Sequence, residues 1–203
     1  MIKKLIIATK NKGKVKDFRQ LFARYNIEVV SLLDIEEGIP DIEETGSTFE
    51  ENAAIKAETI SERFNLPVLA DGSGLVVDIL DGRPGIYSAR YAGEEKNDSA
   101  NIQKLLEELK GTTGSERRAH FVCALAIARP GQETIFKRGV CRGTIAEHPV
   151  GENGFGYDPV FYPEGMDRTM AQLSVEEKNK ISHRHHALAQ LEEWVGSFSE
   201  DQL

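Results

Sequence analysis

The chain has 203 residues, 40% hydrophobic and 29% charged, the balance of a soluble globular protein with one domain or two closely joined lobes. A net charge of −8 excludes broad non-specific binding to nucleic acid, which requires a basic face. Every apolar run falls short of the roughly 20 residues that cross a membrane, and the N-terminal run is too short for a secretory signal. Cys123 and Cys141 lack metal-ligand spacing, so we expect free thiols and a cytoplasmic protein.

The N-terminal third predicts strands alternating with amphipathic helices. Residues 4–9 and 28–33 are typical of strands. The helix predicted between them has its apolar residues at Val15, Phe18, Leu21, Phe22 and Tyr25. An acidic loop follows, and Thr48 with Glu51 then has the pattern of a capping box that opens a helix to about residue 64. The apolar face of this second helix comprises Phe49, Ala53, Ala57, Ile60 and Phe64.

The segment LADGSGLVVD, residues 69–78, predicts two strands, 66–71 and 75–80, that meet at a turn. Asp71 and Ser73 stand at this turn, with a glycine after each. The carboxyl end of a strand is a favoured ligand position in α/β folds, so Asp71 is a candidate catalytic acid. A local turn in which Asp71 and Ser73 bond to nearby backbone explains the same pattern.

The remaining chain predicts a turn at DGRPG, a helix over residues 97–110 ended by Gly111, and two long strands joined at Pro130 and Gly131. A glycine- and aromatic-rich loop covers residues 151–165. Ser174 and Glu177 cap a last helical region that breaks near residue 182 and runs to about 198. Because helical and hairpin connections are mixed, the fold class is α/β with a mixed sheet.

Two basic regions are candidates for binding a polyanion. In ATKNKGKVKDF, Asn11 and Gly13 tolerate the backbone angles of an anion-binding nest at a helix start, and three lysines add charge. A strand–helix turn with solvated lysines fits equally well. Lys56 lies at the margin of an apolar helix face, where it either points into a cleft or extends its charge into solvent. Glu43 and Glu44 precede that helix, where acids are stabilised in any case.

Two further segments carry stacking and donor groups. In GFGYDPVF, Phe155 and Tyr157 either offer flat faces to a base or fill the core. In EEKNKISHRHH, Lys178, His183 and Arg184 are hydrogen-bond donors, or else solvated helix charges. The histidines lack the spacing of a zinc site.

Six segments occur in this order: TKNKGK, EETGSTFEENAAIKA, LADGSGL, GRPGIYSARYAG, GFGYDPVF and EEKNKISHR. With them the chain closely resembles, from residue 1 to about 195, the Ham1-like inosine/xanthosine triphosphate pyrophosphatases. The resemblance implies an elongated α/β fold in a single domain over residues 1–203, with a long central mixed β-sheet flanked by helices and two lobes around a substrate cleft. It also implies a homodimer that uses Mg²⁺ to hydrolyse ITP, dITP and XTP to the monophosphate and pyrophosphate, cleansing the nucleotide pool, with no nucleic-acid or membrane partner.

The resemblance also assigns roles to residues. Phosphate binding falls to Thr9, Lys10, Asn11, Lys12, Gly13, Lys14 and Lys56, and substrate contact to Ser73. The nucleotide pocket is expected to comprise Phe155, Gly156, Tyr157, Asp158, Lys178, His183 and Arg184. The O6 acceptor of hypoxanthine and xanthine suits N–H donors on His183 and Arg184, whereas adenine would leave those donors unpaired.

One position departs from the family pattern. The family has two adjacent acids, ADDSG, and the second is its proton acceptor and a metal ligand, whereas this chain has ADGSG. Asp71 and Gly72 are therefore the catalytic positions, and Glu44, Asp71 and Gly72 the metal positions. Gly72 is a replacement in this sequence, or natural with Asp71 or Glu44 taking over, or the mark of a binder that sequesters or senses ITP or XTP. We favour the first, which predicts impaired turnover with intact binding.

Overall fold

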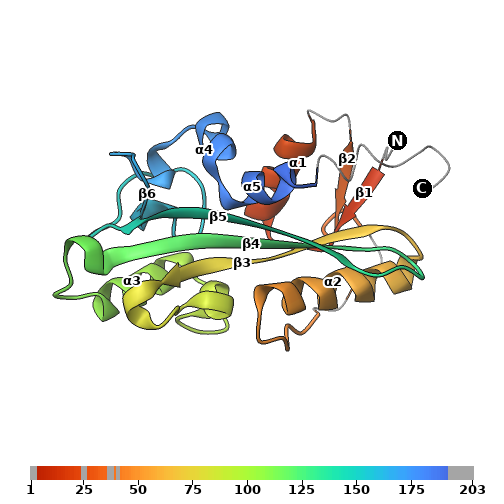
Figure 1. The fold of residues 1–203 in the computed structure, drawn as a ribbon, viewed down its shortest axis with the longest axis horizontal. Helices are drawn as coiled ribbons and strands as arrows, with labels where there is room; N and C mark the ends of the chain where they lie inside the picture. The colour runs from red at the N-terminus through yellow and green to blue at the C-terminus, as the bar shows by residue number, and fades with distance from the viewer. Residues whose placement is uncertain (1–3, 24–26, 36–38, 40–41, 192–203) are drawn as a thin grey trace. The chain divides into compact units, whose positions relative to one another are not determined.

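The computed structural model describes residues 4–23, 27–35, 39 and 42–191, which form an α/β fold (Figure 1). The chain divides into two compact units. Unit 1 comprises residues 1–72, 123–139 and 185–203, and unit 2 comprises residues 73–122 and 140–184. Three long strands contribute residues to both units.

The described strands are β1 (Lys4–Ile7), β2 (Glu28–Ser31), β3 (Val68–Val77), β4 (Arg118–Ala128), β5 (Ile135–Ile145) and β6 (Phe161–Pro163). Their order in the sheet is β2-β1-β3-β4-β5-β6. Strand β1 pairs in parallel with β2 and β3, whereas β6 is antiparallel to β5, so the predicted mixed sheet is confirmed. The α-helices in the described residues are α1 (Lys12–Ala23), α2 (Phe49–Phe64), α3 (Asp98–Glu108), α4 (Val175–Ile181) and α5 (His183–Ala189).

Unit 1 has apolar side chains on both faces of its strands. Leu69 of β3 belongs to one cluster, with Phe18 of α1 and Leu188 of α5. Its neighbour Ala70 belongs to the other, with Ala57 of α2. Successive residues of a strand point to opposite faces, which explains the division. The small side chains on the α2 side let that helix lie close to the sheet.

Unit 2 has its own core, which packs β-strand residues against α3 and the loop after β5. Leu75 of β3, Phe121 of β4 and Phe161 of β6 share this cluster with Leu105 of α3. Tyr157 is also a member. The second interpretation of the aromatic loop, in which its aromatics fill the core, is therefore correct for Tyr157.

The turn predicted at Asp71 is wrong. Strand β3 runs without interruption through Asp71, Gly72, Ser73 and Gly74, so Asp71 lies in mid-strand rather than at a strand end. The sequence Asp-Gly-Ser-Gly is typical of turns, but a glycine within a strand also allows another backbone to approach closely. That second use applies at Gly72, which the backbone of Phe49 approaches closely.

Most other element predictions agree with the structure, but residues 161–163 of the predicted loop form strand β6, and residues 78–80 of a predicted strand form a 3-10 helix. The side chain of Thr48 accepts a hydrogen bond from Glu51 N at the start of α2, and that helix ends at Phe64. Ser174 and Glu177 form the predicted capping box, and the break at Ser182 separates α4 from α5. The side chain of Leu21, Tyr25, and the predicted helix end near 198 lie outside the described residues. None of the helices in the described ranges is long and apolar enough to cross a membrane.

Candidate functional site

The predicted site residues fall into two groups, one in each unit. The lysine–carboxylate group, in unit 1, consists of Lys14, Glu44, Lys56 and Asp71. The aromatic–cation group, in unit 2, consists of Phe155, Asp158, Lys178 and Arg184.

Lys56 is the centre of the lysine–carboxylate group. From α2 its Nζ donates to Glu44 Oε1 at 2.6 Å and to the main-chain oxygen of Asp71 at 2.7 Å. The side chain is 12% exposed, so it extends along the protein rather than into solvent. Lys56 therefore ties the segment before α2 to strand β3.

Asp71 connects this network to Lys14 of α1. Its side chain is fully buried, and Oδ2 is 2.9 Å from Lys14 Nζ. Because the carboxylate forms an ion pair with a residue distant in the sequence, the alternative of a local turn around Asp71 is wrong. The pair places an anion beside the first turn of α1, where helix dipole and lysine both favour it.

The loop that precedes α1 is built differently from the predicted nest. Asn11 and Gly13 have ordinary backbone angles, since neither has a positive φ. The Asn11 side chain instead caps α1, accepting a hydrogen bond from Lys14 N at 3.0 Å, and Thr9 Oγ1 accepts from Asn11 N. Lys12 is exposed at the helix start. The predicted cationic helix N-terminus is present, although its geometry is that of a capped helix.

Gly72 has no room for a side chain. An ideal Cβ on Gly72 would lie 2.9 Å from the carbonyl carbon of Phe49 and closer still to its oxygen. Phe49 is the first residue of α2, and its own ring is buried. The backbone of α2 therefore occupies the space that a side chain at position 72 would need.

In unit 2, Asp158 is the common acceptor of the aromatic–cation group. Its Oδ2 accepts from Lys178 Nζ at 2.8 Å and from Phe155 N at 2.9 Å. The side chains of Lys178 and Asp158 are 7% and 6% exposed. Lys178 Nζ and the Arg184 guanidinium lie 4.8 Å and 5.3 Å from the centre of the Phe155 ring, within cation–π distance.

The remaining predicted residues of unit 2 surround this group. Arg184 Nη2 donates to Ser73 Oγ at 3.2 Å, and the His183 ring stacks on Phe121. The Tyr157 hydroxyl donates to the Ser88 carbonyl, and burial raises the pKa of Tyr157. The Tyr157 ring is buried in the core, so of the two predicted stacking aromatics only Phe155 is partly exposed.

Comparison with known proteins decides the family. The model of the Ham1 family matches residues 5–194. The chain belongs to the Ham1 family. A dITP/XTP pyrophosphatase of Oceanobacillus iheyensis is 60% identical over 96% of this chain and 98% of its own length. The Ham1 protein of Staphylococcus aureus is 48% identical, covers 96% of this chain and 98% of its own, and superposes with a TM-score of 0.83. A HAM1 protein of Coxiella burnetii is 41% identical over 98% and 100%, with a TM-score of 0.85.

Sequence reasoning missed several residues that hold the site of this Ham1 chain in place. Asp98, the first residue of α3, accepts a hydrogen bond from Gly156 N at 2.7 Å. Asn52 is 1% exposed, and its Oδ1 accepts from Gly46 N at 2.8 Å, which fixes the chain just after Glu44. Neither has a local pattern of its own, because each contact joins segments that only the fold brings together.

Only two of the three predicted metal positions of the Ham1 chain have a carboxylate side chain. Glu44 and Asp71 supply carboxylates, and Gly72 supplies none. Within the ranges that the structure describes, no three His, Cys, Asp or Glu side chains are grouped so as to hold a metal ion. A cation at this place would therefore take most of its ligands from a bound molecule and from water.

Proposed function

We propose that this chain hydrolyses dITP, ITP and XTP to the nucleoside monophosphate and pyrophosphate. Two findings support the proposal: membership of the Ham1 family, and 60% identity to a protein named dITP/XTP pyrophosphatase. The observation that carries it is the lysine–carboxylate group, in which Lys56 binds both Glu44 and the backbone of Asp71.

The charges of unit 1 suit a triphosphate. A triphosphate has several negative charges, and an acidic protein can bind it only where cations are gathered. Lys10, Lys12 and Lys14 lie at the start of α1, where the helix dipole also favours anions. Positive charge placed here would stabilise the charge that develops on the pyrophosphate leaving group.

We propose that Mg²⁺ accompanies the substrate. Mg²⁺ is usually bound by one or two carboxylates together with phosphate oxygens and water. Glu44 fits this arrangement because its carboxylate is 29% exposed, whereas the Asp71 carboxylate is fully buried and paired with Lys14. When bound, the ion would neutralise phosphate charge as a Lewis acid.

The side chains of unit 2 support the proposed preference for a purine base with an oxygen at position 6. Phe155 offers a partly exposed ring, and Lys178 and Arg184 beside it have only N–H donors. A base with an oxygen at position 6 satisfies such donors, whereas the amino group of adenine does not.

We also propose that the enzyme is a cytoplasmic homodimer. The support is the resemblance to the family, and sedimentation velocity tests the oligomeric state directly.

Pyrophosphate release from dITP, ITP and XTP, with dATP, ATP and GTP as controls, tests the proposed reaction. We expect Mg²⁺-dependent release from the first three, with dATP slower by about 100-fold or more because its amino group leaves buried donors unpaired. Equal rates with dITP and dATP would contradict the assigned base pocket. Loss of activity with excess EDTA and recovery with Mg²⁺ tests the metal.

A second candidate, a binding protein without turnover, is favoured by one observation: position 72, the family's proton-acceptor position, has no carboxylate. Such a protein would bind dITP and leave it intact. Calorimetric binding without pyrophosphate release over many hours would establish this alternative and contradict the enzyme.

A further inference from the structure

The Phe155 loop of unit 2, residues 154–158, carries the partly exposed ring of the aromatic–cation group. Gly154 and Gly156 on either side of Phe155 both have a positive φ, of 78° and 60°. Glycine loses more conformational freedom on folding than any other residue, so a segment with a glycine on each side of Phe155 is costly to fix in one conformation. The contacts that hold this loop therefore decide where the ring lies.

Asp158 and Tyr157 hold the loop at its carboxyl end. Asp158 Oδ2 accepts from Phe155 N at 2.9 Å, which closes the loop on its own last residue. The Tyr157 hydroxyl donates to the Ser88 carbonyl at 2.8 Å, and the Tyr157 ring lies in the core. Gly156, between Phe155 and Tyr157, is held by a residue from outside the loop.

Asp98 of α3 supplies the contact to Gly156. Its Oδ2 accepts a hydrogen bond from Gly156 N at 2.7 Å, a short distance of the kind expected where the acceptor is a carboxylate. Phe155 N and Gly156 N are thus each bound by a carboxylate from a different part of the chain. Both peptide groups that flank the Phe155 Cα are therefore fixed in orientation, and with them the direction of its side chain.

Helix α3 is a rigid support for Asp98. The side chain of Asn97 caps the helix at its start, and Leu105 is fully buried in the core of unit 2. Between them, the Asn101 side chain is 2% exposed and binds two main-chain groups of the preceding segment. Residues 98 and 101 are three positions apart, so both side chains lie on the same side of α3. Asp98 is therefore presented to the loop by a helix that packing and hydrogen bonds hold in place.

A second explanation for Asp98 is local to α3. An acid in the first turn of a helix is stabilised by the helix dipole, and Asp98 is exposed. That role needs a negative charge, whereas the contact with Gly156 needs only an acceptor oxygen. The two explanations therefore predict different results for asparagine and alanine at position 98.

We propose that Asp98 is a positioning residue for the base and acts through Phe155. The proposal rests on the proposed function, in which the purine stacks on the Phe155 ring. Without the Asp98 contact the ring would be in place for only a fraction of the time, and the apparent affinity would fall in proportion. Once substrate is bound the ring is in place, so the chemical step is unchanged. The effect therefore falls on KM and not on kcat.

Steady-state kinetics with dITP and Mg²⁺ tests the proposal in Asp98→Ala and Asp98→Asn. We expect Asp98→Ala to raise KM by about 3-fold or more with kcat unchanged, because a hydrogen bond to a charged group is lost. Asp98→Asn keeps an acceptor oxygen and should have the KM of the parent. Glu107→Ala, at an exposed acid of the same helix, is the control. A parent-like KM in Asp98→Ala, or equal increases in both Asp98 variants, would overturn the proposal.

Inorganic tripolyphosphate, with Mg²⁺ in excess, separates a positioning role from a general loss of structure. It carries the charges that we propose bind in unit 1, but it has no base. Its inhibition constant should therefore be the same for Asp98→Ala and for the parent. An inhibition constant that rises in the same proportion as KM would show that Asp98 only supports the fold, and would overturn the proposal.

A double-mutant cycle with Phe155→Leu tests whether Asp98 acts through the ring. In the Phe155→Leu background, Asp98→Ala should change KM by less than about 2-fold, because two residues that serve one contact are not additive. Effects on KM that multiply would show that Asp98 acts independently of Phe155, and would overturn the proposal.

Failure of this proposal can be told apart from failure of the proposed function. An active parent with an unchanged KM in Asp98→Ala overturns the role of Asp98 alone. A parent that releases no pyrophosphate contradicts the proposed reaction, and the Kd of a non-hydrolysable α,β-methylene analogue of dITP then replaces KM in the same comparison. Weaker binding by Asp98→Ala, restored in Asp98→Asn, would still support the role of Asp98. A parent that neither hydrolyses dITP nor binds the analogue overturns both.

Discussion

The two groups of candidate residues both contain a lysine–carboxylate pair, yet they differ in access to solvent. In unit 1, Lys56 and Glu44 are 12% and 29% exposed, whereas in unit 2 Lys178 and Asp158 are 7% and 6% exposed. The accessible pair is placed to take part in catalysis, whereas the buried pair is placed to form a rigid support for a bound base. Changes in unit 1 should therefore alter turnover, while changes in unit 2 should alter stability and base discrimination.

The largest effect on stability is expected for Lys178→Met. Removing one partner of a buried ion pair destabilises a protein by about 3–5 kcal/mol, and Asp158 would keep its charge in a buried place. At about 2–4 °C per kcal/mol for a chain of this size, the melting temperature should fall by roughly 6–20 °C. Lys180→Met, at an exposed lysine of the same helix, is the control. Equal melting temperatures for the two variants would show that burial does not distinguish the groups.

Lys56→Met should mainly affect turnover. Loss of a fixed cation at a site of developing charge lowers the rate by about 100- to 1,000-fold, and here it also releases Glu44. Steady-state kinetics with dITP measures the effect, and thermal unfolding checks that the fold persists. Lys16→Met changes an exposed lysine of unit 1 and should behave as the parent. A large fall in melting temperature with unchanged kcat would show that Lys56 stabilises the fold and does not contribute to turnover.

Phe155→Leu should weaken base recognition without altering chemistry. Stacking of a base on an aromatic ring contributes about 1–3 kcal/mol, so KM for dITP should rise by roughly 5-fold or more while kcat changes little. The exposed Phe136 of unit 1 provides the control Phe136→Leu. A fall in kcat with unchanged KM would mean that Phe155 does not contact the base.

The smallest effect is expected at Asp34, which belongs to neither group. Hydrogen bonds from the Ser31 hydroxyl and amide, with the Arg19 guanidinium, lower the pKa of Asp34 from 3.8 to about 2. A depressed carboxyl pKa stabilises the folded state above the unfolded value, and that stabilisation is lost as pH falls from about 4 to 2.

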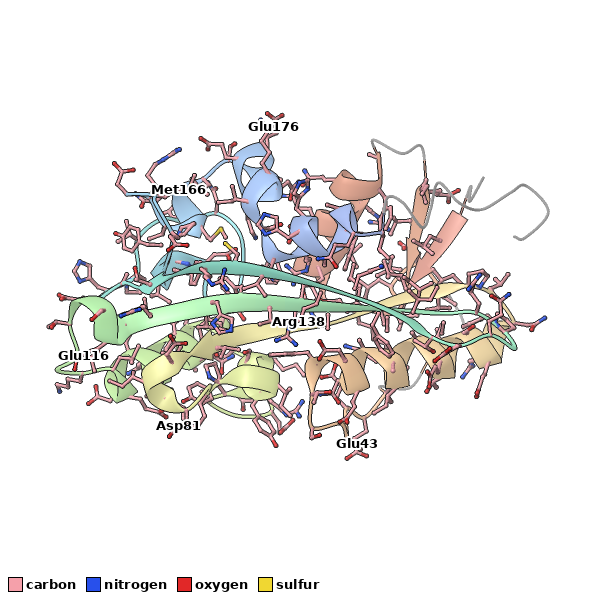
Figure 2. The ribbon with its side chains drawn as sticks, viewed as in Figure 1. Glu43, Asp81, Glu116, Arg138, Met166 and Glu176 are labelled. Carbon is pink, nitrogen blue, oxygen red and sulfur yellow. The ribbon has the colours of Figure 1, made fainter. Side chains whose placement is uncertain are left out.

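Asp34→Asn should therefore have a lower melting temperature than the parent at pH 7, with the gap closing toward pH 2. The effect should be modest, since the side chain is 39% exposed. Asp81→Asn, at an aspartate on the surface of unit 2, is the control (Figure 2). A difference in melting temperature that widens as pH falls would contradict the assigned direction of the pKa shift.

Local pattern predicted most elements, because helices and strands follow residue spacing and capping. Thr48 and Ser174 each begin a helix where their cap patterns predict one. The prediction failed at Gly72, where local chemistry favours a turn and a tertiary contact decides otherwise. Close approach of Phe49 to Gly72 is not visible in the sequence, since the two residues belong to different segments that only folding brings together.

The sequence could identify which residues belong to the candidate site, but not how those residues are arranged. Resemblance named Glu44 and Lys56 together, and they form an ion pair. It gave no sign that Lys56 would bind the main chain of Asp71, or that Tyr157 would lie in the core. Main-chain contacts and burial depend on packing between distant segments, which a residue pattern does not encode.

The most direct measurement is hydrolysis of dITP in ¹⁸O-labelled water, followed by mass spectrometry of both products. Attack of water on the α-phosphorus, with pyrophosphate leaving, predicts one label in dIMP and none in pyrophosphate. Label in pyrophosphate, or release of inorganic phosphate and dIDP, would contradict the proposed reaction. Intact dITP after prolonged incubation with Mg²⁺ would contradict it as well and leave a binding protein in its place.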